Sequence, residues 1–143
     1  MPTIQICTGT ERGIPLILEL IRGLADYEKL ADQVTATEEQ LRETLFGPKS
    51  AAELLLAYDK SECAGFALFF QNYSTFLAKP GMYLEDLYVK PHRRGQGIGL
   101  ALLQHLARLA LERGYGRMEW GVLDWNEPSI QFYEKLGAEP MLK

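Results

Sequence analysis

The sequence predicts a mixed α/β domain, and three observations lead to this fold class. Short apolar segments switch between the spacing of strands and that of helices, in the order β-α-α-β-β-β-α-β-α. No repeat and no linker rich in proline, glycine or serine divides the 143 residues, so we expect one domain over residues 1–143. The composition, 47% hydrophobic and 24% charged, is that of a globular chain with a buried core. Two consecutive helical segments and three consecutive strand segments exclude a regular doubly wound parallel sheet.

The first half of the chain is expected to contain a strand, two helices and a hairpin. Residues 3–7 alternate weakly as a strand does. Apolar residues then recur at helical spacing over 14–25, with Pro15 in the first turn. Thr37 and Gln40 form a capping box for a shorter helix that ends near Phe46, before Gly47 and Pro48. Residues 53–58 and 63–71 are apolar segments on either side of a polar turn, which predicts a β-hairpin.

The second half is expected to alternate strands and helices. The Pro80-Gly81 pair should interrupt the chain before a strand at 82–89, and a loop rich in arginine and glycine follows at 91–99. Apolar residues spaced i, i+4, i+8 and i+11 from Ile98 predict a long helix that ends near Gly114. Residues 117–123 predict a further strand. Asn126 should cap a last helix that closes at Gly137.

Charge and cysteine usage exclude several classes of function. The net charge of −4 argues against nucleic-acid binding, which needs clustered lysine and arginine. Cys7 and Cys63 lack the spacing of a disulfide framework or a zinc site, and we expect both to be reduced core thiols. His92 and His105 lack metal-ligand spacing as well, so no metal is expected. With no secretory signal and no apolar run of about 20 residues, we expect a cytoplasmic protein without a membrane partner.

The most informative segment, 84–99, runs from a strand through a glycine-rich turn into a helix. Glycines there let successive backbone N–H groups point at one anion, and the helix dipole adds attraction, so a pyrophosphate is the natural ligand. The segment lacks the Gly-Lys-Ser/Thr of a nucleotide triphosphate loop, and Leu102 stands where a dinucleotide fingerprint would need its third glycine. A glycine-rich helix start without a ligand is the alternative interpretation.

The pattern Arg94-x-x-Gly97-x-Gly99 after a strand resembles the acetyl-CoA signature of the GNAT superfamily of N-acetyltransferases. Segments 24–28, 83–89 and 122–129 are similar to the diamine (spermidine/spermine) acetyltransferase branch, and 73–75 with 123–125 to its thialysine acetyltransferase relatives. The resemblance implies a GNAT-like, mainly antiparallel central sheet flanked by about four helices, and a homodimer. Members of the branch continue beyond the position of Pro140 through one or two more strands, which the expected sheet would lack here.

The same resemblance implies acetyl-CoA as co-substrate. A central strand would separate from its neighbour and leave backbone N–H groups free for the pantetheine arm and the acetyl carbonyl, where they would stabilise charge on oxygen. The glycine-rich loop would bind the pyrophosphate, and Arg94 would add positive charge near it. For Asn126, capping of the last helix is expected in addition. The implied acetyl-CoA residues are Leu87, Tyr88, Val89, Arg94, Gly95, Gln96, Gly97, Ile98, Gly99, Leu100, Asn126, Ser129 and Tyr133.

Two residues are expected to be catalytic. An alkylamine has a pKa of roughly 10, so it must lose a proton to attack a thioester, and the resemblance assigns this proton transfer to Glu85, directly or through water. Asp86 need not share the site, because adjacent strand residues face opposite sides; if both carboxyls were partly buried, a raised pKa would suit a base. Tyr133 is implied as the acid that protonates the departing thiolate, with a core tyrosine as the alternative.

The substrate is expected to be a small cationic amine. Acidic side chains attract such a molecule, and the resemblance implies that Tyr27, Glu28, Glu85, Asp86, Glu119, Trp120 and Gly121 contact it. The sequence thus predicts an acetyl-CoA-dependent N-acetyltransferase acting on a polyamine, thialysine or a related amine. Acetyl would pass directly, because neither cysteine has a neighbouring histidine to activate it. Acetylation of protein lysines or N-termini, and a non-catalytic acetyl-CoA-binding module, are the alternatives.

Overall fold

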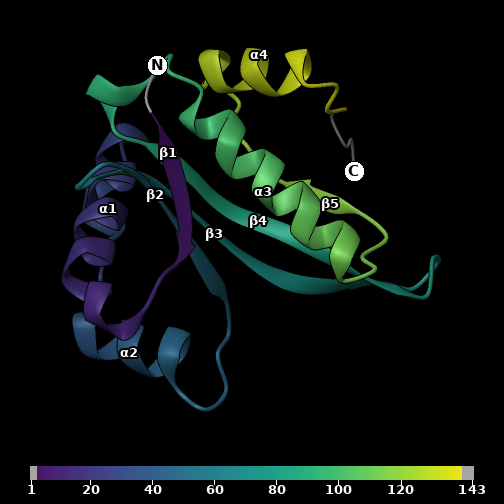
Figure 1. Cartoon of the computed structure of the whole chain (residues 1–143), viewed down its shortest axis with the longest axis horizontal. Helices are drawn as coiled ribbons and strands as arrows, with labels where there is room; N and C mark the ends of the chain where they lie inside the picture. Colours follow the sequence, from purple (N-terminus) through teal and green to yellow (C-terminus); the bar gives the residue numbers. More distant parts are fainter. Residues whose placement is uncertain (1–2, 140–143) are drawn as a thin grey trace.

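The computed structural model describes residues 3–139, which form a five-stranded sheet in the order β1-β2-β3-β4-β5 with four α-helices around it (Figure 1). Neighbouring strands pair antiparallel, except that β5 runs parallel to β4. This arrangement and the order of the elements confirm the predicted mixed α/β fold class. The elements are β1 Ile4–Thr8, α1 Ile14–Tyr27, α2 Glu38–Phe46, β2 Glu53–Asp59, β3 Glu62–Ser74, β4 Lys79–Val89, α3 Ile98–Glu112, β5 Met118–Trp120 and α4 Glu127–Lys135, with 3-10 turns at Glu11–Gly13, Ala31–Gln33 and Pro91–Arg93.

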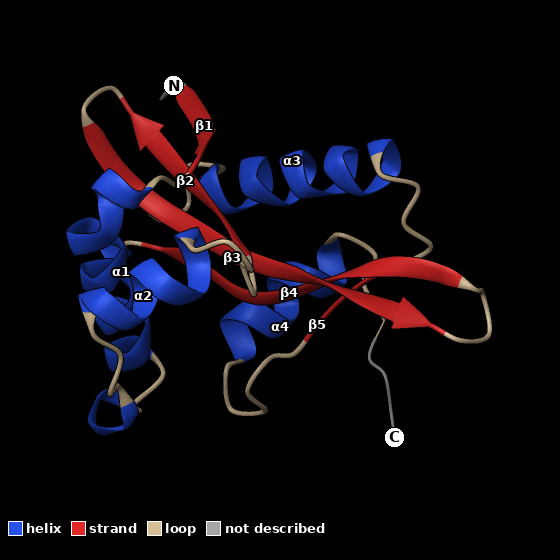
Figure 2. Ribbon diagram, turned by 90° about the horizontal axis from the view of Figure 1, so that it is seen from below, coloured by secondary structure: helices blue, strands red, loops and turns tan. Residues whose placement is uncertain are grey.

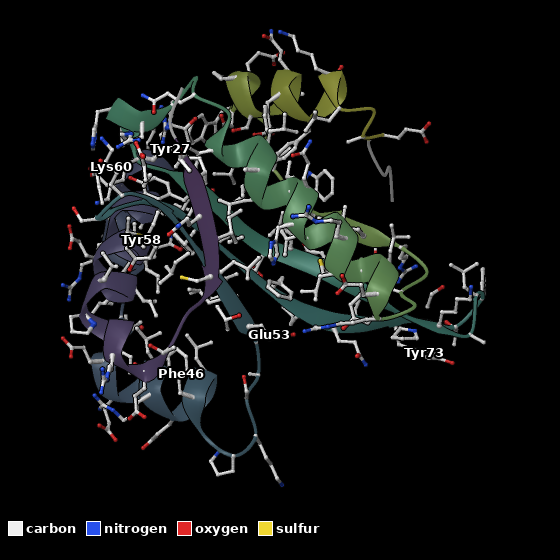
Figure 3. The ribbon with its side chains drawn as sticks, viewed as in Figure 1. Tyr27, Phe46, Glu53, Tyr58, Lys60 and Tyr73 are labelled. Carbon is white, nitrogen blue, oxygen red and sulfur yellow. The ribbon has the colours of Figure 1, made fainter. Side chains whose placement is uncertain are left out.

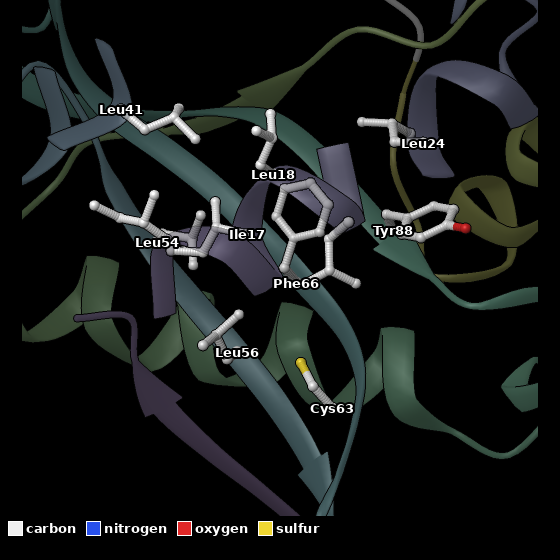
Figure 4. Close-up of a cluster of buried hydrophobic side chains, with 11 residues drawn as sticks. Ile17, Leu18, Leu24, Leu41, Leu54, Leu56, Cys63, Phe66 and Tyr88 are labelled. Carbon is white, nitrogen blue, oxygen red and sulfur yellow. The ribbon is translucent and has the colours of Figure 1, made fainter. Parts of the chain in front are cut away.

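Helices lie on both sides of the sheet (Figure 2), and an apolar cluster packs against each face. Side chains alternate between the two faces of a strand, so in β2 Leu54 and Leu56 face α1 and α2 whereas Leu55 and Ala57 face α3. The first cluster is centred on Phe66, which is fully buried (Figure 4). The two apolar clusters hold the sheet between α1 and α2 on one face and α3 on the other.

Local signals in the sequence explain where two helices begin. At the start of α2, Thr37 Oγ1 accepts a hydrogen bond from the backbone N–H of Gln40 at 3.1 Å, and Gln40 Oε1 accepts one from Thr37 N–H at 3.0 Å. The predicted capping box is therefore present. At the start of α3, Gly97 has a φ of +83°, a left-handed conformation that glycine adopts without steric strain.

Three sequence expectations need correction. Pro80 and Gly81 do not interrupt the chain but lie within β4, opposite Tyr73 and Asn72, because a missing N–H is tolerated near the end of a strand. The strand expected at 117–123 is limited to β5, since its pairing with β4 stops at Trp120. Cys63 is buried as expected, but Cys7 is exposed, because β1 is an edge strand. The expectation about strands beyond Pro140 lies outside the described residues.

Candidate active site

The site begins where β4 and β5 separate. The parallel pairing ends at Leu84 and Trp120, although β4 continues to Val89. Just after the end of β4, the N–H of Lys90 donates to the carbonyl oxygen of Ala64 in β3 at 2.8 Å. Because N–H groups alternate in direction along a strand, those of Leu87 and Val89 point to the opposite edge, where β5 has ended. The free backbone groups expected from the resemblance therefore face the gap between the two strands.

A cavity of about 360 Å³ occupies this gap. Its walls come from the end of α1, the second half of β4, the glycine-rich loop, the start of α3, the segment after β5, and α4. The structure thus brings together residues that lie more than 100 positions apart in the sequence. The predicted site residues that line it are Tyr27, Glu28, Glu85, Asp86, Leu87, Tyr88, Val89, Arg94, Gly95, Gly97, Ile98, Gly99, Leu100, Gly121, Asn126, Ser129 and Tyr133.

Three predicted site residues do not line the cavity. Glu119 is paired with Arg117 Nε at 2.8 Å and accepts a hydrogen bond from Asn72 Nδ2 at 3.2 Å. Gln96 accepts one from Arg93 Nε at 3.2 Å. Trp120 packs against Tyr133, with 5.0 Å between ring centroids, and so supports a cavity residue from behind. Gln96 is thus bonded within its own loop, whereas Glu119 and Trp120 contact other elements, β3 and α4.

Five lining residues were missed by the sequence reasoning: Leu24, Arg93, Val122, Pro128 and Phe132. Leu24, Val122 and Phe132 are apolar residues on elements whose periodicity indicates only a core-facing side. Pro128 lies in the first turn of α4, where a proline is typical of a helix start and gives no sign of a ligand site. Arg93 precedes Arg94 in the loop. The loop is rich in arginine and glycine, and this composition indicates that both arginines could lie at the site.

A β-bulge brings Glu85 and Asp86 to the same cavity. Opposite β3, Leu84 pairs with Phe69 and Asp86 with Leu68, which leaves Glu85 without a partner. An extra residue of this kind breaks the alternation of faces, and both residues line the cavity. The expectation that neighbouring strand residues keep to opposite faces is therefore wrong at this position.

The three carboxyls of the cavity influence one another. Burial, then the negative charges of Glu85 and Glu28, raise the pKa of Asp86 from 3.8 to about 7. Burial and then the charge of Glu85 also raise the pKa of Glu28. A site of this kind favours a cation, because a positive group would relieve the repulsion among the carboxylates.

Tyr133 lies on α4 at the wall of the cavity, between the rings of Trp120 and Phe132. Burial, with smaller contributions from Glu28 and Tyr27, raises the pKa of its phenol to about 12. The phenol therefore stays protonated at neutral pH and can donate a proton. Tyr133 therefore packs against neighbouring rings and also lines the cavity; its role as the acid stays a prediction.

Tyr27, labelled in Figure 3, lies at the end of α1 and contacts two other parts of the site. Its hydroxyl donates to Asn126 Oδ1 at 2.9 Å, and the guanidinium of Arg94 lies 4.3 Å from its ring centroid. Asn126 is buried and also accepts from Ser129 N–H at 3.4 Å, which confirms the predicted cap of α4. With its Oδ1 occupied twice, Asn126 leaves its amide N–H₂ as the group that can serve a ligand.

The loop before α3 has the chemistry of an anion site. Gly95 and Gly97 have φ angles of +77° and +83°, and a Cβ at either would meet nothing within 4 Å, so the loop backbone is open to a ligand. Arg94 holds its charge beside this backbone and donates from Nε to Val89 O at 2.9 Å. These donors fit a pyrophosphate at the helix N-terminus.

Within residues 3–139, no group of three or more histidine, cysteine or acidic side chains is placed to hold a metal ion. None of the described helices is long and apolar enough to cross a membrane.

Comparison with known proteins places this geometry in context. Residues 20–138 match the model of the acetyltransferase (GNAT) family. The chain is 42% identical to the thialysine N-epsilon-acetyltransferase of Bos taurus, over 99% of this chain and 87% of that protein. It is 33% identical to the L-ornithine N5-acetyltransferase of Arabidopsis thaliana, over 95% and 78%. An aminoglycoside acetyltransferase from an uncultured soil sample has the same fold, with a TM-score of 0.83 at 20% identity over 98% of this chain and 92% of that one.

Proposed function

The chain belongs to the acetyltransferase (GNAT) family and is an N-acetyltransferase, and on this basis we propose that it transfers acetyl from acetyl-CoA directly to the primary amine of a small cationic substrate. Thialysine, ornithine and polyamines are the candidate amines. The thialysine and ornithine acetyltransferases among its relatives support the first two.

The donor half of the site supports acetyl-CoA. The glycine-rich loop and Arg94 would bind the pyrophosphate, and the free N–H groups of Leu87 and Val89 would bind the pantetheine arm and the acetyl carbonyl. When bound, acetyl-CoA supplies the activated acetyl thioester. A backbone N–H directed at the carbonyl stabilises the negative charge that develops on oxygen during attack.

The acidic half of the site supports a cationic amine. Glu28, Glu85 and Asp86 would hold the ammonium form, and Glu85 would remove its proton directly or through water. Asp86 is a second candidate for the base, because its pKa of about 7 matches neutral working conditions. Both residues line the same cavity at the bulge, which makes either carboxylate a candidate to receive the proton.

Tyr133 would return a proton to the departing thiolate, since its phenol is protonated at neutral pH. Direct transfer is supported by the position of the thiols. Neither Cys7 nor Cys63 lines the cavity, and burial raises the pKa of Cys63, which makes it a poor nucleophile.

The observation that carries this proposal is one cavity that joins an anion-binding loop to three carboxyls. The test is steady-state kinetics with acetyl-CoA and thialysine, ornithine, lysine, putrescine and spermidine, followed by release of the free thiol. We expect the free amines to be acetylated faster than lysine-containing peptides, as measured by mass spectrometry. A clear preference for peptides would refute the proposed substrate class and support protein acetylation instead. The homodimer and the cytoplasmic location stay predictions.

A further inference from the structure

Arg93 differs from its neighbours in the glycine-rich loop. Among residues 91–97 it is the one whose side chain is largely covered, with 14% exposed, whereas the others are exposed. Arg93 lines the cavity, and its guanidinium forms ion pairs with Asp59 and Glu62. Asp59 ends β2 and Glu62 begins β3, so the two carboxylates stand at either end of the β2–β3 turn, in which Lys60 is labelled in Figure 3.

The contacts of Arg93 fix the loop on two sides. Two guanidinium nitrogens bond to the β2–β3 turn, and the third, Nε, donates to Gln96 Oε1 within the loop at 3.2 Å. Next to it, His92 Nε2 lies 2.9 Å from Glu62 Oε2. The loop is thus joined to a hairpin that takes no other part in the site.

The loop has reason to need such an anchor. Gly95 and Gly97 both adopt left-handed conformations, and glycine loses more backbone freedom on ordering than any other residue. A loop that is already ordered spends less binding free energy when its N–H groups engage an anion. The charge of Arg93 is offset by two carboxylates, so it adds little net attraction for phosphate, whereas Arg94 has no such pair among the described residues.

We propose that Arg93 is a positioning residue, which orders the glycine-rich loop for the donor pyrophosphate by clamping it to Asp59 and Glu62. This inference rests on the proposed use of acetyl-CoA. It assigns a role in donor binding to the β2–β3 turn, which lies outside the cavity.

The direction in which one substitution changes the affinity for acetyl-CoA distinguishes a positioning role of Arg93 from direct phosphate binding. Asp59→Asn removes a negative charge and frees Arg93, so simple electrostatics predicts tighter binding of acetyl-CoA. A positioning role predicts weaker binding, because the loop loses half of its clamp. We expect about a tenfold rise in the Kd for CoA by calorimetry and in the KM for acetyl-CoA, with kcat within about twofold. Glu62→Gln should act in the same direction.

The substitution Arg93→Lys is a second test of whether the contacts of Arg93 order the loop. Lysine keeps the charge but cannot reach two carboxylates and Gln96 with a planar fork of donors, so it should weaken CoA binding as Asp59→Asn does. The matched control is Glu53→Gln, which breaks the ion pair with Arg113 at the other end of β2, about 20 Å from Asp59. It makes the same change of charge and should leave the Kd for CoA unchanged.

The outcomes are distinct. Weaker CoA binding by Asp59→Asn and Arg93→Lys, with Glu53→Gln unchanged, supports the clamp. Equal or tighter binding by Asp59→Asn overturns it, as does an equal loss in Glu53→Gln. If the unmodified protein neither binds CoA nor turns over acetyl-CoA, the proposed function fails, whatever the variants do.

Discussion

Replacing Asp86 with asparagine should stabilise the protein, and more so as the pH rises. The folded structure raises the pKa of Asp86 from 3.8 to about 7. The folded state disfavours the ionised form of this carboxyl. The free energy of unfolding therefore falls as the pH rises from the unfolded pKa of the group through its folded pKa. Relative to a neutral side chain, ionisable Asp86 then lowers the free energy of unfolding by at most about 2 kcal/mol at pH 5 and about 4 kcal/mol at pH 8.

The assay is urea unfolding of both proteins at pH 5 and pH 8. The difference between Asp86→Asn and the unmodified protein should widen by about 2 kcal/mol between the two pH values, whatever the other titrating groups contribute to both. Asp32→Asn, a change at an exposed carboxyl after α1, is the control and should show no such widening. A difference for Asp86→Asn that is constant or narrows with pH would refute the burial and repulsion argued for this carboxyl.

Three further substitutions test the site and its support. Tyr133→Phe should lower kcat about 100-fold with little change in the KM for acetyl-CoA, since it removes a proton donor from the reaction, and initial rates measure this. Tyr27→Phe removes the hydrogen bond to Asn126 and should lower the free energy of unfolding by about 1 kcal/mol in urea; no loss would show that this bond is not maintained in solution. Phe66→Ala should cost about 3–5 kcal/mol in the same measurement, because it empties the centre of a fully buried cluster, and a loss below about 1 kcal/mol would contradict that packing.

Helix caps and helical periodicity in the sequence predicted the helices well, because both depend on residues that are close together along the chain. Thr37 and Gln40 satisfy the backbone at the start of α2, and Asn126 does so for α4, whatever the rest of the chain does. Helical periodicity predicted the start of α1 and α3 because a helix buries one side at a fixed spacing. Pro80 and Gly81 misled the same reasoning, since a hairpin partner decided that they lie within a strand.

The residues of the site were largely predictable as well, through the loop pattern and the resemblance that it supports. Gln96, Glu119 and Trp120 do not line the cavity. Glu119 accepts a hydrogen bond from the distant Asn72, and Trp120 packs against Tyr133 of α4, contacts that no local pattern indicates. Arg93 was missed for the same reason, because its partners Asp59 and Glu62 lie more than 30 positions earlier.

The sequence by itself determined the order of the elements, their caps and the family, because these depend on near neighbours and on motifs along the chain. Only the tertiary structure decided that β5 separates from β4 after Trp120. It also decided that a bulge places Glu85 and Asp86 at the same cavity. Strand register is a relation between distant segments, and burial is a property of the whole packed molecule. For that reason the raised pKa of Asp86 could be seen only once the chain was folded.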